Sequence, residues 1–312
     1  MTAHVRRRRP IFAALLALAF LPARAAVTET HAQAAKASVS DKSLFLSILD
    51  ADGRPVPDVR MGDLLIREDG QDREIVAIKP ASQPISVVVL VDTAQGRRVT
   101  DAYGTPEEYV RDIRVAVSAF AKQLLSRSPD ASVMLMEFGQ AAIPVVPFTQ
   151  HALEFDKGVN RLTAKPGVGS VLLEAIAAAN SELTRRPSTR RAIVSLNLEP
   201  SNEQSREEPK KIVESFRASG AQLWSVSVQR GGLKNSKRDL VINDFAKVTG
   251  GRRDFVVGIS AVAGIMQRYA DALAGQYEIV YKRPESNKVP QLIQVGTMLP
   301  NVKAHASGFP PQ

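Results

Sequence analysis

The sequence contains no cysteine, and aromatic residues make up only 5% of its 312 residues. Without cysteine, the chain forms no disulfide, has no thiol nucleophile and offers no attachment point for a lipoprotein anchor. The zinc motif H-E-x-x-H, the nucleophile turn G-x-S-x-G and the phosphate-binding P-loop are also absent, and His151 and His305 lie far apart in the chain. We therefore predict that the protein is not an enzyme.

A strong excess of charge is also missing once the first 25 residues are set aside. The whole chain carries 41 basic and 32 acidic residues, but five arginines and no acidic residue lie within 1–25. The net charge of +9 thus falls to about +4, which, with so few aromatic residues, gives no reason to expect nucleic acid binding. We expect three arginine pairs to be solvated, with an acidic protein or an anionic lipid headgroup as an alternative partner. These pairs are Arg185 with Arg186, Arg190 with Arg191, and Arg252 with Arg253.

Residues 1–25 have the three parts of a secretory signal peptide. Arginines at positions 6–9 form a basic segment, residues 11–21 are an uninterrupted apolar run, and Ala23-Arg24-Ala25 fits a cleavage site. The apolar run is shorter than the roughly 20 residues that a transmembrane helix needs, and we expect no transmembrane segment after it. We predict cleavage after Ala25 and a periplasmic or secreted protein; a short anchor that is never cut is the alternative.

Strand-like segments lie at both ends of the remaining chain, behind a predicted tether at 26–38. The first segment covers 39–82, where Asp69-Gly70 is typical of a hairpin turn, and the second covers 276–312. Because a small sheet needs partners, we expect the strands of the two segments to pair into one β-module. The predicted strands are 43–49, 63–68, 74–78, 277–282 and 291–297.

Residues 83–275 alternate between strand and helix. The apolar run at 86–91 is typical of a strand buried on both faces of a parallel sheet. Thr105, Pro106 and Glu108 predict the start of a long helix with a capping box. We therefore predict a doubly wound α/β fold, with a mostly parallel sheet flanked by helices and the β-module as a smaller part. Further predicted strands are 132–138, 192–196, 222–228 and 255–257, and further predicted helices are 171–185, 207–219, 239–249 and 260–275.

This pattern resembles that of a von Willebrand factor A domain. Residues 86–92, followed by a polar loop and a long helix, look like the opening of such a domain, and residues 165–176 and 190–196 look like its later loops. The resemblance extends over about residues 38–310. The flanks resemble the terminal segments of an exported bacterial family called VWFA-related, at 50–56, 63–70, 276–281 and 307–309.

Domains of this kind usually hold a divalent cation at a metal-ion-dependent adhesion site. The ligands come from D-x-S-x-S in a first loop, a threonine in a second and an aspartate in a third, and such oxygens suit Mg²⁺. The resemblance places Asp92 at the first carboxylate and Ser170 at the threonine. Ala94 and Gly96 stand at the two hydroxyl positions and Leu198 at the third-loop carboxylate, so these three offer no side-chain oxygen. The resemblance therefore implies a degenerate site.

The predicted function is that of an exported, non-catalytic protein-binding module without a metal or other cofactor, whose partner is unidentified. One alternative is a metal-dependent adhesion or regulatory protein with an altered Mg²⁺ site built from Asp92, Ser170 and Glu199, with Asp101 close in sequence. Another is a structural subunit of an envelope assembly that binds through its β-module. The predicted ligand-binding loops contain Asp92, Ala94, Gly96, Ser170, Leu198 and Glu199.

Overall fold

The structure is a computed structural model. It describes residues 39–95, 104–166, 169–199, 202–229, 236–285 and 288–311. The predicted signal peptide with its cleavage site at Ala25, the predicted tether, and the positions Gly96 and Asp101 lie outside these residues. Among the helices that the structure describes, none is both long and apolar enough to cross a membrane.

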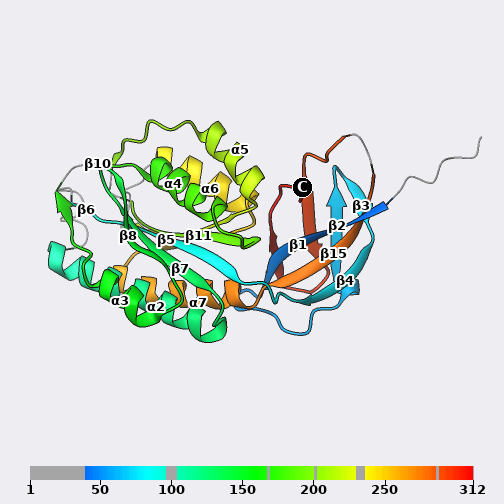
Figure 1. The fold of residues 1–312 in the computed structure, drawn as a ribbon, viewed down its shortest axis with the longest axis horizontal. Helices are drawn as coiled ribbons and strands as arrows, with labels where there is room; N and C mark the ends of the chain where they lie inside the picture. The colour runs from blue at the N-terminus through cyan, green and yellow to red at the C-terminus, as the bar shows by residue number, and fades with distance from the viewer. Residues whose placement is uncertain are drawn as a thin grey trace, which may run out of the picture. The chain divides into compact units, whose positions relative to one another are not determined.

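A six-stranded sheet with helices on both faces forms the α/β part of the fold (Figure 1). Its order is β14-β13-β11-β5-β7-β8, and neighbouring strands are parallel except that β8 runs antiparallel to β7. Numbered along the chain, these strands follow the doubly wound order 3-2-1-4-5-6, whose direction of growth reverses between β5 and β11. The predicted fold class is thus confirmed. The strands are β5 Ile85–Asp92, β7 Ser132–Phe138, β8 Ala142–Thr149, β11 Arg190–Leu198, β13 Gln222–Val228 and β14 Arg253–Val256.

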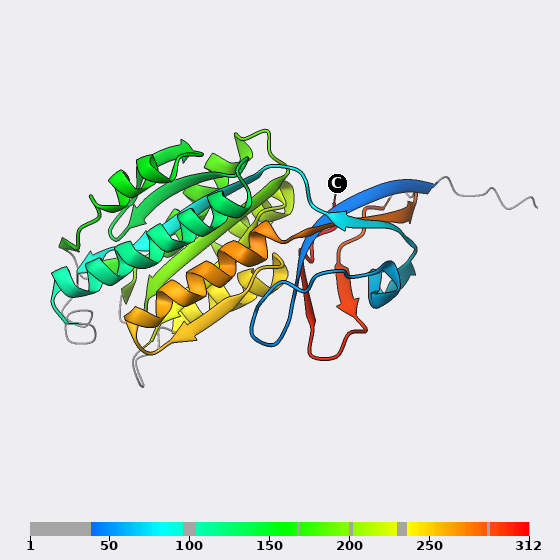
Figure 2. The same ribbon diagram turned by 90° about the horizontal axis from the view of Figure 1, so that it is seen from below.

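The central strand β5 is apolar along its length because it contributes to two hydrophobic cores. Val87, Val89 and Val91 pack with α2, α3 and α7, whereas Val88 and Leu90 pack with α4, α5 and α6. In Figure 2, α2 and α7 lie side by side across one face of the sheet. The helices are α2 Pro106–Arg127, α3 Ala152–Val159, α4 Leu172–Thr184, α5 Pro209–Ser219, α6 Ser236–Val248 and α7 Val262–Ala274, with a 3-10 turn η2 Ile259–Ala261 before α7.

Helix α2 begins with the predicted capping box. The Thr105 hydroxyl accepts from the backbone N–H of Glu108 at 3.4 Å, and the Glu108 carboxylate accepts from the backbone N–H of Thr105 at 2.8 Å. Pro106 occupies the first helical position, where a backbone N–H would have no partner within the helix.

Strands from both ends of the described chain form the β-module, as predicted. One sheet has the order β17-β1-β15-β4 and the other has the order β16-β2-β3. Strand β1 lies between β15 and β17, so the N-terminal strand is enclosed by two C-terminal ones. The strands are β1 Val39–Leu49, β2 Leu64–Glu68, β3 Gln71–Arg73, β4 Ile75–Pro80, β15 Tyr277–Pro284, β16 Ile293–Thr297 and β17 Lys303–Ala306, with a 3-10 turn η1 Met61–Asp63 before β2.

The predicted hairpin turn is present, but its second strand is not the one expected. Asp69 and Gly70 both have positive φ, 48° and 82°, as a tight hairpin turn of the primed type requires. The strand that follows and pairs with β2 is the short β3, whereas residues 75–80 form β4, which pairs with β15 in the other sheet. The predicted strands 63–68 and 74–78, which flank this turn in the sequence, therefore do not pair with each other.

A buried carboxylate joins the two sheets of the β-module. Glu68, at the end of β2, is fully buried and accepts hydrogen bonds from Arg283 at 2.6 Å and Tyr281 at 2.6 Å, both on β15. Arg73 of β3 donates to the other carboxylate oxygen at 3.0 Å. Burial alone would raise the pKa of Glu68, but these hydrogen bonds outweigh it and hold the pKa below its usual value.

Candidate functional site

The candidate site lies at the carboxyl ends of β5 and β11, where the doubly wound sheet reverses its direction of growth. Open α/β sheets usually bind ligands at such a point. Asp92 is the last residue of β5 and Leu198 the last of β11. Two short parallel pairings hold the loops above them, β6 Ala94–Gln95 with β9 Lys165–Pro166 and β10 Gly169–Ser170 with β12 Asn202–Glu203.

The carboxylate of Asp92 is fully buried and surrounded by N–H donors. Its Oδ1 accepts from the backbone N–H of Ala94 at 3.1 Å, and its Oδ2 accepts from the backbone N–H of Leu198 at 3.2 Å. The structure thus brings together three of the predicted site residues. Ala94 and Leu198, which lack a side-chain ligand, contribute backbone donors instead.

A buried guanidinium provides the remaining partner of Asp92. Arg238 has a fully buried side chain, and its Nη2 donates to Asp92 Oδ2 at 2.9 Å and to Ser170 Oγ at 2.7 Å. Its Nη1 donates to the Leu198 carbonyl at 2.9 Å, and its Nε donates to Glu203 Oε2 at 3.0 Å. One cation therefore binds the carboxylate and the hydroxyl that sequence analysis assigned to the degenerate metal site.

The hydrogen-bond geometry at this cluster favours the ionised pair, although burial leaves the pKa of Asp92 above its usual value. Burial raises the pKa of Asp92, and the charge and hydrogen bond of Arg238 oppose that shift. Burial lowers the pKa of Arg238, but the nearby charges of Asp92, Glu203 and Glu199 outweigh it and raise the pKa. Because both oxygens of Asp92 accept from N–H donors, the geometry is that of a carboxylate rather than a protonated acid.

Glu203 connects this cluster to the start of α4. Its Oε1 accepts from the backbone N–H of Leu172, the first residue of α4, at 3.2 Å and from that of Ser205 at 3.1 Å. The hydroxyl of Ser205 accepts from the next helical N–H, of Leu173, at 2.9 Å. A carboxylate at a helix N-terminus is favoured by the helix dipole, so Glu203 stabilises α4 and Arg238 together.

Glu199 belongs to a neighbouring ion pair rather than to the Asp92 cluster. Its Oε1 accepts from Arg253 Nη2 at 3.1 Å, and both side chains are buried. Arg253 also donates to Ser227 Oγ at 3.2 Å and stacks over the Phe255 ring at 4.3 Å from its centroid. Within the described ranges, no group of three or more histidine, aspartate or glutamate side chains is arranged to hold a metal ion.

Sequence analysis missed Arg238 and Glu203. The predicted helix 239–249 begins three residues earlier, at Ser236, which places Arg238 in the first turn of α6. A signal was nevertheless available, because a buried aspartate needs a cation, and Arg238 lies close to the start of a predicted helix. The residue could have been suspected on these grounds, but its partners could not.

The expectation that the three arginine pairs are solvated was wrong for two of them. The residue Arg190 is 4% exposed, and the side chain of Arg253 is also 4% exposed. Arg190 begins β11 and Arg253 begins β14, so both lie where a strand enters the packed sheet. Arg185 is exposed, as expected.

No family model and no curated protein matches the chain. Solved structures that are similar to it include BatB from Bacteroides thetaiotaomicron, with 17% identity, a TM-score of 0.44, and coverage of 60% of this chain and 98% of that one. They also include the VWA domain of SpRpn10, with 13% identity, a TM-score of 0.44, and coverage of 58% and 94%. A von Willebrand factor type A protein from Catenulispora acidiphila has 11% identity, a TM-score of 0.48, and coverage of 88% and 73%.

Proposed function

We propose that this α/β fold of the von Willebrand factor A type is an exported, non-catalytic protein-binding module in which Arg238 takes the place of the metal ion. The observation that carries the proposal is the set of contacts made by its guanidinium, to Asp92, Ser170, Glu203 and the Leu198 carbonyl. A cation of the chain itself therefore pairs with both carboxylates of the site.

The surroundings of Arg238 disfavour a bound Mg²⁺. Magnesium takes six oxygen ligands at about 2.0–2.1 Å, and Ala94 and Leu198 supply no side-chain oxygen. An altered site of Asp92, Ser170 and Glu199 would require Arg238 to leave two of these side chains and Arg253 to leave the third. These departures would leave buried Arg253 without its carboxylate and buried Arg238 with Glu203 alone, and breaking a buried ion pair typically costs several kcal/mol.

The partner surface that we propose lies beside the cluster, at the carboxyl end of β14. Phe255 is 49% exposed and Val257 is 71% exposed, so two apolar side chains face solvent at this sheet edge. Arg253 connects Phe255 to the predicted loop residue Glu199, because it pairs with Glu199 and stacks on Phe255. Since Arg238 itself is fully buried, recognition here relies on surface side chains rather than on a bridging cation.

Metal independence is tested by thermal melting of the mature protein in EDTA and then in excess Mg²⁺ or Mn²⁺. We expect the same melting temperature in all three, because a metal that does not bind the native state cannot stabilise it. An increase of several degrees on adding either metal would contradict the proposal.

Partner binding is tested with a photo-crosslinking amino acid at Val257 in the full chain, expressed in its native cells. The matched control carries it at Leu153 on α3, which is 76% exposed. We expect a discrete crosslinked product from position 257 but not 153, and the same yield in EDTA. No product from 257, or a product lost in EDTA, would contradict the proposal.

A further inference from the structure

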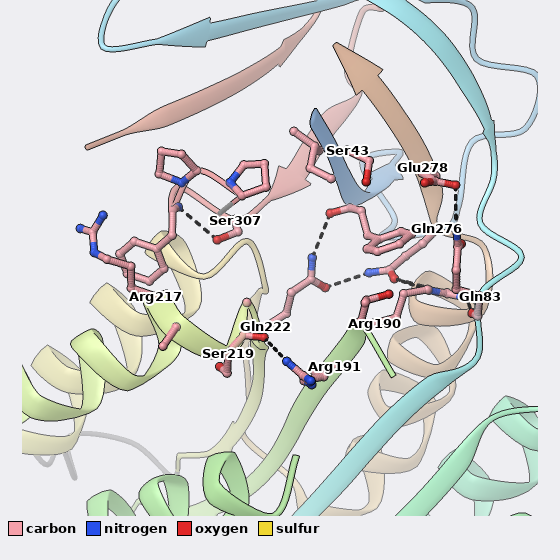
Figure 3. Close-up of a pocket in the computed structure, with 18 residues that line it drawn as sticks. Ser43, Gln83, Arg190, Arg191, Arg217, Ser219, Gln222, Gln276, Glu278 and Ser307 are labelled. Carbon is pink, nitrogen blue, oxygen red and sulfur yellow. Dashed lines mark hydrogen bonds between the residues drawn. The ribbon is translucent and has the colours of Figure 1, made fainter. Parts of the chain in front are cut away.

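A cavity of about 390 Å³ lies at the amino ends of β11 and β13, at the opposite end of these strands from Asp92 (Figure 3). Strand β11 contributes Arg190 and Arg191, strand β13 contributes Gln222, and the tail that contains Phe309 closes another side. The volume lies within the range of about 300–1,000 Å³ that is usual for small-molecule sites.

Arg190 is a buried cation whose hydrogen-bond partners are all neutral. It is 4% exposed, and its Nη1 and Nη2 donate to the carbonyls of Gln83 at 2.6 Å and Leu273 at 2.7 Å. Its Nε and Nη2 share the side-chain oxygen of Gln276 at 3.3 Å. These bonds leave one N–H of Nη1 without an acceptor among the described residues.

Each of the other buried arginine side chains in the described residues forms an ion pair with a carboxylate. Arg238 pairs with Asp92 and Glu203, Arg253 with Glu199, and Arg283 with Glu68. For Arg190, burial lowers the pKa to about 10 with no carboxylate to oppose the shift. An uncompensated buried charge is costly, and a bound anion would remove that cost.

Neutral side chains fix the wall that leads to Arg190. Gln222 donates to the Phe45 carbonyl at 3.5 Å, Gln276 donates to Gln222 at 2.8 Å, and Gln276 accepts from Arg190. Figure 3 shows this chain of amides along one side of the cavity. Because each amide is oriented by the next, the guanidinium is held in place without a counter-ion.

Two further arginines give the lining a positive charge. Arg191 donates to the carbonyls of Ser219 and Arg186, and in the described structure its buried Nε has no partner. Arg217 stacks over Phe309 at 4.7 Å and donates to a carbonyl. The charged lining residues are these two, Arg190 and Glu278, and Glu278 is already bound by Lys79 at 3.1 Å and by Gln83 at 2.9 Å. Three arginines and one glutamate give the lining a net charge of +2.

We propose that this cavity binds a small organic anion whose phosphate or carboxylate group pairs with Arg190 and whose apolar part packs against Phe45 and Phe309. The remaining N–H of Arg190 Nη1 can donate to an oxygen of either kind of anion, and the positive charge of the guanidinium strengthens that hydrogen bond. The proposal is independent of Arg238 and of metal binding, since it concerns the other end of the sheet.

The test is isothermal calorimetry and thermal melting of the mature protein with three probes of similar shape, at low ionic strength. Phenyl phosphate and benzoate carry the two oxyanions, and benzamide is their neutral counterpart. We expect saturable binding of at least one anion, an increase in melting temperature at saturation, and no binding of benzamide. The anion that binds with the higher affinity identifies the oxyanion group that the site prefers.

Variants locate the binding. We expect Arg190→Gln to weaken the binding of the preferred anion by about tenfold or more, with smaller losses for Arg191→Gln and Arg217→Gln. Arg111→Gln on the exposed face of α2 is the matched control and should leave binding unchanged. If Arg190→Gln does not fold, as judged by circular dichroism, the double variant of Arg191 and Arg217 replaces it. No saturable binding of either anion, equal binding of benzamide, or unchanged affinity in the folded arginine variants would overturn the proposal.

Discussion

Arg238, Arg253 and Arg283 illustrate how single residues organise this protein. Each is buried against a carboxylate, and each pair connects segments that are distant in the sequence. Arg238 and Asp92 are 146 residues apart, and Arg283 and Glu68 are 215 apart. Such pairs contribute little net stability compared with apolar packing, but they are costly to break on one side only, so they favour one arrangement of the chain.

Arg238→Ala is therefore expected to lower the free energy of unfolding by about 3–5 kcal/mol, because Asp92 and Glu203 are left buried without their cation. Mg²⁺ or Mn²⁺ should restore part of this loss in the variant, since the two carboxylates and the Ser170 hydroxyl then become available as hard ligands. Urea denaturation with and without metal measures both effects.

The matched control for that experiment is Arg253→Ala, which removes a buried arginine from a single carboxylate, that of Glu199. We expect this variant to have a lower free energy of unfolding than the wild type, and we expect neither Mg²⁺ nor Mn²⁺ to restore it. A loss in Arg238→Ala below about 0.5 kcal/mol, the range of neutral surface changes, or equal metal recovery in both variants would contradict the role given to Arg238.

How far the sequence predicts this site depends on the distance over which its residues interact. Asp92, Ser170 and Leu198 could be placed because they follow recognisable strands or precede a recognisable helix. The guanidinium of Arg238 could not be placed in this way, because its partners lie 35 to 146 residues away in the sequence. Only the packing of the folded chain brings them together. Asp92 looks like a residual metal ligand in the sequence, and only the fold reveals that its partner is an arginine.

Elements with a strong periodic pattern were predicted well, and those without one were missed. The buried strands β7 and β13 begin and end at the predicted residues, because all their positions except Glu137 and Gln222 are apolar or small. Strand β8 contains Pro144 and Pro147 and was not predicted. Proline is tolerated there because β8 is an edge strand, where one row of backbone groups has no ladder to join. The eight-residue α3 was also missed, since it spans only two turns.

The N-terminus of α2 offers a test at the level of one element. Thr105→Ala removes the side chain that accepts from the Glu108 N–H, and we expect it to lower the free energy of unfolding by about 1 kcal/mol. Ser126→Ala near the other end of the same helix is the control. It removes an exposed hydroxyl without uncapping the helix, so urea denaturation should show little change. Equal losses in the two variants would contradict the capping role.

At the scale of the whole described molecule, the β-module and the α/β part are joined by hydrogen bonds and by shared packing. Ser47 of β1 donates to the Ala272 carbonyl of α7 at 2.9 Å, and the Gly308 N–H donates to the Val248 carbonyl of α6 at 2.7 Å. His305 of β17 lies 6.0 Å from the Trp224 ring of β13, and its Nδ1 is 3.1 Å from the Gly251 carbonyl. Because β1 pairs with β15 and β17, this junction can form only when both ends of the chain are in place.

The junction should weaken in acid. Burial lowers the pKa of His305 below its usual 6.5, and the charges of Arg252 and Lys303 lower it further, while the Gly251 carbonyl and Asp254 oppose them. The unfolded chain therefore binds a proton first. Stability from this residue is complete above pH 6.5 and is lost as the pH falls from 6.5 towards the folded pKa.

Urea denaturation over a series of pH values measures this loss. The variant His305→Gln should reduce the fall in stability just below pH 6.5, while His151→Gln, at the exposed start of α3, should retain it. The same fall in all three proteins would contradict a role for His305.

Under the proposed function, the guanidinium at Asp92 supplies the positive charge that a metal ion would otherwise bring to this site. A bound metal has to be acquired from the surroundings after each copy of a protein is made, and it can be exchanged for a competing ion. Arg238 is encoded in the gene and arrives with the polypeptide, so every copy carries the same cation in a one-to-one ratio. A shortage of divalent ions therefore does not affect Arg238, and only a mutation of its codon can remove this cation.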